Sequence, residues 1–142
     1  MFPDSLIDPV TVQAYHETHY RVYTDLPLTL HVGVASAPLS ALYKSRRVQS
    51  CAFITACNPL GQCVCESVNV QRQETLARQL RQRSLQFIEG TGQHPTNGWP
   101  GEASFLVWSL PLEAGKVLGR QHQQNAIVWC ASDAVPQLVL LR

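Results

Sequence analysis

Polar and acidic side chains gather in three stretches of this sequence that together could perform chemistry. The first stretch is AFITACNP, which ends at Asn58 and Pro59; the second is the loop 91–103; the third is GRQHQQNAIVW at 119–129. Carboxylate oxygens can hold Mg²⁺, basic side chains can position a phosphodiester, and amides can orient water. We therefore predict a metal-assisted site for phosphodiester hydrolysis, as in a Mg²⁺-dependent nuclease.

Each role in this predicted site has its candidate residues. The candidate Mg²⁺ ligands are Glu89 and Glu102, which are also candidate catalytic residues together with the amides Asn58, Gln124 and Asn125. The candidate substrate contacts are Arg72, Arg120, Asn69, Trp99, Ser104, Gly90 and Gly92.

Two other interpretations of these residues stay open. The N-terminus of a long helix that begins near residue 67 could bind a phosphate through its backbone N–H groups, with Gly90 and Gly92 nearby. Alternatively, the amides satisfy loop backbone groups and have only a structural role. A non-catalytic protein-interaction or scaffold domain would keep the same amides for that reason.

Nucleophilic and thiolate chemistry have weaker support. There is no G-x-S-x-G motif, and the spacing of Cys57, Cys63 and Cys65 lacks the paired pattern of zinc sites. Five cysteines are an odd number, which favours reduced thiols and a cytoplasmic location over a secreted disulfide framework.

Basic residues concentrate in one third of the chain. Between residues 44 and 83, seven Lys and Arg residues against two Glu residues give a charge of +5. This distribution predicts weak, salt-sensitive binding to nucleic acid, with a solvated helix face as the alternative. We also expect a homodimer formed through an exposed strand edge.

The elements that must position the site follow the order β-α-β-β-α-β between residues 50 and 131. Strands are predicted at 50–56, 86–90, 104–110 and 125–131, with helices at 67–85 and 112–122. This order is that of an α+β, ferredoxin-like core, with sheet order 4-1-3-2 and both helices on one face. In that arrangement the candidate residues lie at one edge of the sheet.

The rest of the chain is predicted to elaborate this core. Within residues 1–48 we expect a helix at 9–18, a hairpin from 19–24 and 28–34, and a helix at 38–47. These elements are expected to cover the open sheet face, and residues 132–142 to add an edge strand after Pro136.

Composition bounds the class of protein. A chain of 142 residues with 45% hydrophobic residues fits one domain with one core, in which Phe53 and Phe105 are core residues rather than base-stacking platforms. Neither a signal peptide nor an apolar stretch of about 20 residues is present, so we expect a soluble protein without a membrane partner.

Several of these stretches also carry a resemblance. The segments AFITACNP, EASFLVW and GRQHQQNAIVW, with Asn69 and the GTG after the second core strand, occur in an order that resembles a bacterial family known as domain of unknown function 3293. The resemblance covers residues 15 to 140. It supports the boundaries of the core and the choice of sheet edge, and it implies no particular activity.

Overall fold

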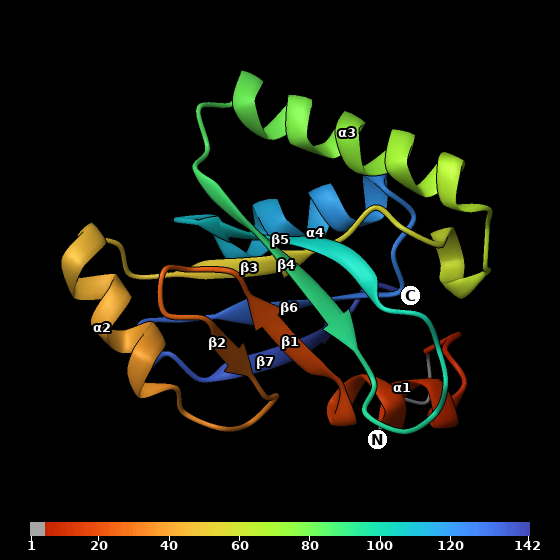
Figure 1. Ribbon diagram of the computed structural model, residues 1–142, viewed down its shortest axis with the longest axis horizontal. Coiled ribbons are helices and arrows are strands. Elements are labelled where there is room, and N and C mark those ends of the chain that lie inside the picture. The colour runs from red at the N-terminus through yellow and green to blue at the C-terminus, as the bar shows by residue number, and fades with distance from the viewer. Residues whose placement is uncertain (1–4) are drawn as a thin grey trace.

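The apolar segment at residues 51–54 forms the centre of the fold as strand β3 (Cys51–Ile54), in which all four residues are buried. A strand buried on both sides needs a layer of structure on each face of its sheet. The other strands are β1 (His19–Val22), β2 (Leu28–Leu30), β4 (Phe87–Gln93), β5 (Glu102–Trp108), β6 (Ala126–Cys130) and β7 (Pro136–Leu140). The computed structural model describes residues 5–142 and joins these strands in one antiparallel sheet of order β2-β1-β4-β5-β3-β6-β7 (Figure 1).

The four core strands have the neighbours that the sequence predicts. β3 pairs with β5 on one side and with β6 on the other, and β4 pairs with the outer side of β5. All six elements expected between residues 50 and 131 are present. The largest change is that β4 continues to Gln93 and β5 begins at Glu102, so that the long loop shortens to residues 94–101.

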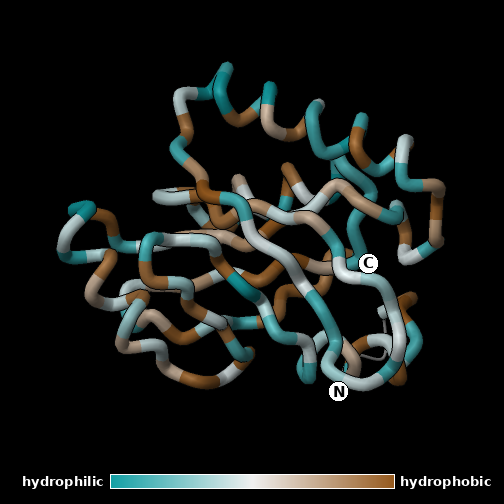
Figure 2. The backbone as a smooth tube through the Cα atoms, viewed as in Figure 1, coloured by the Kyte–Doolittle hydropathy of each residue, from teal (hydrophilic) through white to brown (hydrophobic). Residues whose placement is uncertain are grey.

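One face of the sheet is covered by α3 (Glu66–Gln82) and α4 (Leu112–Gln121). Leu76 and Leu80 of α3 and Leu118 of α4 are fully buried, in one cluster with the inward side chains of β3, β5 and β6. Hydrophilic and hydrophobic stretches alternate along α3, as expected for a helix with one buried side (Figure 2).

The opposite face carries α2 (Ala37–Arg46) at one end and α1 (Pro9–Glu17) at the other (Figure 1). Leu39 and Tyr43 of α2 pack in a second cluster with Cys51, Trp108 and Cys130. α1 begins as predicted, because the side chain of its N-cap residue Asp8 accepts a hydrogen bond from the backbone N–H of Val10 at 2.8 Å.

The N-terminal hairpin lies elsewhere than predicted. β1 and β2 do not cover the open face but extend the sheet beyond β4, with Tyr20 opposite Gly92 and Val22 opposite Gly90. β1 thereby satisfies the backbone groups of a β4 edge that the core alone would leave unpaired. The backbone N–H of Gly33 donates to the carbonyl of Pro136 at 2.8 Å, so the sheet curls until the segment after β2 reaches the start of β7.

Two further expectations have clear outcomes. Phe53 and Phe105 are both buried and belong to the core, as predicted. β7 is the edge strand expected after residue 131, because it pairs with β6 alone. Among residues 5–142, no helix has the combination of length and apolar character that crossing a membrane requires.

Candidate functional site

A cavity of about 290 Å³ lies at one end of the sheet, on the face that carries α1 and α2. α2 covers the Cys51 end of this face, whereas the cavity lies over Phe53 and Ser104 at the other end. α1 contributes the outer wall. Seven residues predicted for the site line this cavity: Asn58, Gly92, Trp99, Glu102, Ser104, Gln124 and Asn125.

Asn58 fixes the loop that follows β3. Its Nδ2 donates to Oε2 of Glu102 at 2.7 Å, and its Oδ1 accepts from Nδ2 of Asn69 at 2.9 Å and from the backbone N–H of Val64 at 3.2 Å. Its own backbone N–H donates to Oδ1 of Asn69 at 2.8 Å. Asn58 has a left-handed backbone (φ 49°), which Asn adopts more readily than most residues. Asn69, predicted as a substrate contact, therefore holds Asn58 in position.

Glu102 is partly buried in the cavity wall. This burial raises the pKa of its carboxyl, and hydrogen bonds from the side chains of Asn58 and Trp99 offset the rise only in part. Of the residues between 5 and 142 that line the cavity, Glu102 is the one Asp, Glu, Lys or Arg. Among the described residues, the site thus presents one acidic group without a Lys or Arg side chain in the same lining.

Gln124 and Asn125, two of the amides before β6, line the cavity and also form hydrogen bonds to the surrounding segments. Nε2 of Gln124 donates to the carbonyls of Cys57 and His122, each at 3.1 Å. Nδ2 of Asn125 donates to the hydroxyl of Tyr15 at 3.1 Å, and its Oδ1 accepts from Nη1 of Arg142 at 3.0 Å. Oε1 of Gln124 has no hydrogen-bond partner in the part of the chain that the structure describes, so it can accept from a ligand.

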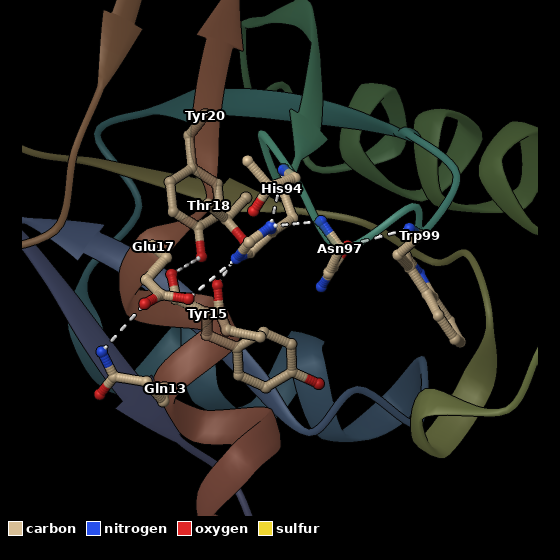
Figure 3. A network of polar contacts seen from close by, with 10 residues as sticks. Gln13, Tyr15, Glu17, Thr18, Tyr20, His94, Asn97 and Trp99 are labelled. Atoms are coloured by element: carbon tan, nitrogen blue, oxygen red, sulfur yellow. Dashed lines mark hydrogen bonds and ion pairs between the residues drawn. The ribbon is translucent and has the colours of Figure 1, made fainter.

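Four aromatic side chains form what we call the aromatic wall of the cavity: Tyr15, Tyr20, Phe53 and Trp99. Tyr20 and Phe53 meet edge to face, with ring centroids 5.2 Å apart. Trp99 is 40% exposed, and Tyr15 and Trp99 project from α1 and from the 94–101 loop respectively (Figure 3). Burial raises the pKa of the Tyr15 hydroxyl, which therefore stays protonated and able to donate.

α1 is held over the cavity by a few polar contacts, because none of its residues is buried. Nδ1 of His94 accepts from the backbone N–H groups of Thr96 and Asn97 at 3.1 and 3.0 Å, which leaves its proton on Nε2. That Nε2 donates to Oε1 of Glu17 on α1 at 2.9 Å (Figure 3). His94 thus links the 94–101 loop to α1.

Glu89 and Glu102, the predicted Mg²⁺ ligands, both line a second cavity, but they do not project from the same face of the sheet. Side chains alternate between the two faces of a strand. Glu102 shares a face with Leu106 and Trp108 of the α2 cluster, whereas Glu89 shares a face with Phe87, which packs against the α3 and α4 cluster. The two carboxylates therefore project from opposite faces of the sheet. Within the described residues, no three His, Cys, Asp or Glu side chains are grouped so that they could hold a metal ion.

The predicted phosphate contacts are also dispersed. Arg72 donates from Nε to the carbonyl of Ala56 at 2.6 Å and from Nη2 to the carbonyl of His122 at 2.7 Å, so it joins α3 to two loops. Arg120 is exposed on the last turn of α4 and does not line the cavity.

The glycines of β4 lie against β1 and the core. A Cβ on Gly90 would collide with the backbone carbonyl of Arg21, whereas a Cβ on Gly92 would make only ordinary contacts with the rings of Phe53 and Tyr20. These positions face the cavity side of the sheet, whereas the N-terminus of α3 lies on the other face. The phosphate-binding interpretation required these glycines to lie beside the N-terminus of α3, and they lie on the other face of the sheet.

The basic residues do not form one surface either. Arg46 of α2 stacks on Trp108 with its guanidinium 4.8 Å from the ring centroid, and Arg81 of α3 stacks on Phe87 at 5.6 Å. α2 and α3 cover opposite faces of the sheet. The charge of +5 in the sequence is thus divided between the two faces.

Comparison with protein families gives one match. The family described as "Protein of unknown function (DUF3293)" matches residues 54–127, which is over half of the chain. The chain belongs to this family. Neither the curated proteins nor the solved structures contain a significant match. The DUF3293 segment includes Asn58, Glu102 and Asn125, so the polar side of the cavity lies within the family region.

Sequence reasoning missed part of the site. Tyr15 and Tyr20 of the aromatic wall lie on α1 and β1, outside the DUF3293 segment, and Leu138 of β7 also lines the cavity. No local pattern marks these residues, because their place depends on the pairing of β1 with β4 and of β7 with β6.

Proposed function

We propose that this protein binds a small organic molecule in the cavity at the sheet end, with Glu102 as its polar anchor. The observation that carries the proposal is one acidic side chain within a largely aromatic and apolar lining. Small-molecule sites are usually concave, mostly apolar and provided with a few polar groups, and they often contain a residue with a perturbed pKa. At about 290 Å³ the cavity is near the lower end of the usual range of such sites.

The arrangement of the fold supports a stable pocket at this place. The strand order β6-β3-β5-β4, with α3 and α4 on one face, supports assignment of the core to the ferredoxin-like class. That core uses its other face for α2 and α1, and the cavity lies at the end of this face that α2 leaves uncovered, with α1 as its outer wall. A site on rigid strands holds its polar groups in fixed positions, which favours ligand binding.

Metal-dependent hydrolysis has less support than ligand binding. A two-carboxylate Mg²⁺ site would need a second acid beside Glu102, and Glu89 projects from the other face. Nucleic-acid binding and homodimer formation stay predictions, since no observation on the surface favours either one over a monomeric ligand-binding protein. Anisotropy with labelled oligonucleotides at two salt concentrations tests the first, and sedimentation tests the second.

A fragment screen by nuclear magnetic resonance tests the proposed function. The library contains neutral, cationic and anionic compounds of up to about a dozen heavy atoms, and binding is read from shifts of cavity-lining amides. The blocking variant is Ala14→Trp, because Ala14 lines the cavity from α1. The matched control is His16→Trp on the exposed side of the same helix.

We expect compounds that bind wild type and His16→Trp but not a folded Ala14→Trp protein. Thr11→Trp is a second blocking variant if Ala14→Trp fails to fold, because Thr11 also lines the cavity. If no compound of any charge shifts the lining amides of wild type, the proposed function is wrong.

A further inference from the structure

The cavity carries negative charge without a Lys or Arg side chain to balance it among the described lining residues. Glu102 is its single Asp, Glu, Lys or Arg among the residues that the structure describes. Two arginines lie near, but both are engaged elsewhere: Arg142 donates to Oδ1 of Asn125, and Arg72 donates to two backbone carbonyls. An ionised carboxylate that is removed from water without a cationic partner is unfavourable. A positively charged ligand would supply that partner.

The aromatic wall adds a second feature that favours a cation. The face of an aromatic ring carries a negative electrostatic potential, and it attracts ammonium groups within about 6 Å of the ring centroid. Aromatic side chains line the cavity from four separate elements, namely α1, β1, β3 and the 94–101 loop. Aromatic lining combined with one carboxylate is suited to organic ammonium groups.

Resting on the proposed function above, we infer that the ligand of this cavity is a small organic cation whose ammonium group pairs with Glu102 and lies against the aromatic wall. The apolar part of the ligand packs on the aliphatic lining, which includes Val10, Ala14 and Val128. Oε1 of Gln124 and the hydroxyl of Tyr15 provide the remaining hydrogen-bond partners.

The same observations disfavour an anionic ligand. No Lys or Arg side chain within residues 5–142 lines the cavity, and both ring nitrogens of His94, which does line it, are engaged with Glu17 and with backbone N–H groups. An anion would also be repelled by ionised Glu102. A neutral ligand would leave the partly buried carboxyl without a counter-ion, so its affinity would lack the ionic contribution that a cation gains. The charge of the ligand therefore distinguishes the inferred cation from anionic and neutral ligands.

Three probes of similar size and shape test this inference: benzylamine, benzyl alcohol and benzoate. Their dissociation constants are measured near neutral pH by calorimetry or by the shifts of cavity-lining amides, in wild type, in Glu102→Gln and in Glu74→Gln. Glu102→Gln keeps an oxygen that can accept from Asn58 but has no charge. Glu74 is exposed on α3 and serves as the matched control for removal of one negative charge.

We expect benzylamine to bind wild type at least about tenfold more tightly than benzyl alcohol, a difference of about 1.4 kcal/mol. Benzoate should bind most weakly. The preference for the amine should disappear in Glu102→Gln and remain in Glu74→Gln. A folded Glu102→Gln protein is expected, because the substitution preserves shape and the hydrogen bond to Asn58.

Other outcomes separate this inference from the proposed function. If benzyl alcohol or benzoate binds as tightly as benzylamine, or if library hits in the cavity include no excess of cations, the ligand class is wrong while ligand binding stands. Retention of the amine preference in Glu102→Gln also overturns the inference. If neither the probes nor any library compound shifts the lining amides, the proposed function fails and the ligand class fails with it.

Discussion

Nδ2 of Asn58 lies 2.7 Å from Oε2 of Glu102, and this hydrogen bond joins two residues that are 44 positions apart in the sequence. It brings the loop after β3 against the start of β5. Asn58 is itself held by a reciprocal pair of hydrogen bonds with Asn69. One amide therefore fixes the carboxyl that we propose as the anchor of the site.

Asn58→Asp should destabilise the protein at neutral pH by about 2 kcal/mol or more. The change removes the donor to Glu102 and places a second carboxylate beside it, and a partly buried acceptor that loses its donor is unfavourable. Acidification should restore part of the loss. Chemical denaturation at pH 7 and pH 4.5 measures both effects.

Asn97→Asp is the control for this substitution. Oδ1 of Asn97 only accepts a hydrogen bond, from the backbone N–H of Trp99 at 2.9 Å, and an aspartate can accept it equally well. Equal destabilisation by Asn58→Asp and Asn97→Asp would contradict a special role for the Asn58–Glu102 contact.

The two glycines of β4 should respond differently to the same substitution. Gly90→Ala should destabilise by about 1–3 kcal/mol, because its Cβ would collide with the carbonyl of Arg21 and lie 3.0 Å from the Phe53 ring. Gly92→Ala should change stability by less than about 0.5 kcal/mol, since its nearest contacts are at an ordinary 3.7 Å. Denaturant midpoints compare the two, and a larger loss for Gly92→Ala would show that β1 and β4 pair in another register.

Most of the fold from residue 50 to 131 is predictable from the sequence because its elements are local. The buried strand at 51–54 is an apolar run, and the apolar positions Leu76, Ala77 and Leu80 recur at helical spacing. The order of these elements then restricts the sheet to few topologies, which correctly brings Asn58, Glu102 and Asn125 to one end.

The rest depends on pairing over long distances, which no local pattern reveals. A strand that ended at residue 90 would place Glu89 near the loop and near Glu102. β4 instead continues to Gln93 and pairs Gly92 with Glu102, so that Glu89 lies opposite Phe105, further along β5. The same extension gives β1 a partner, and β1 brings Tyr20 into the aromatic wall.

The pH dependence of stability should identify the titration of Glu102. Because burial raises the pKa of its carboxyl above 4.5, the folded protein holds a proton that the unfolded chain releases. Its contribution to stability is complete below pH 4.5 and is lost as the pH rises through the folded-state pKa. Glu102→Gln lacks this titration. Its free energy of unfolding, relative to wild type, should therefore increase as the pH rises above 4.5.

The comparison with Glu102→Gln isolates this group from the other titratable groups near it. Tyr15, Tyr20 and Cys57 couple electrostatically with the carboxyl, and burial raises the pKa of each of these three groups. His94 lines the same cavity and is present in both proteins. A difference between the two proteins that is constant from pH 4 to pH 8 would exclude the proposed titration.

Arg72→Met should show that this arginine has a structural role. Removal of its two hydrogen bonds leaves the carbonyls of Ala56 and His122 without that donor, and hydrogen bonds to charged groups contribute about 1.5–3 kcal/mol each. We expect a loss of about 2–4 kcal/mol by denaturation. Arg78→Met, at an exposed position of the same helix, should change stability by less than about 0.5 kcal/mol. If Arg72→Met and Arg78→Met both change stability only slightly, Arg72 has no structural role and is again a candidate substrate contact.

Glu17→Ala should loosen α1 over the cavity while leaving the sheet intact. No residue of α1 is buried, and the contact of Glu17 with Nε2 of His94 is one of the few that hold it. Segments with few buried contacts open locally at low free energy, so amide hydrogen exchange in α1 should become several-fold faster while β3 and β5 exchange as in wild type.

His16→Ala, at an exposed position of the same helix, is the control and should exchange as wild type does. Glu17→Ala should also release a cavity-bound probe faster than wild type does, because α1 forms the outer wall of the cavity. Unchanged exchange in α1 would mean that contacts such as Tyr15 with Asn125 are sufficient to hold the helix.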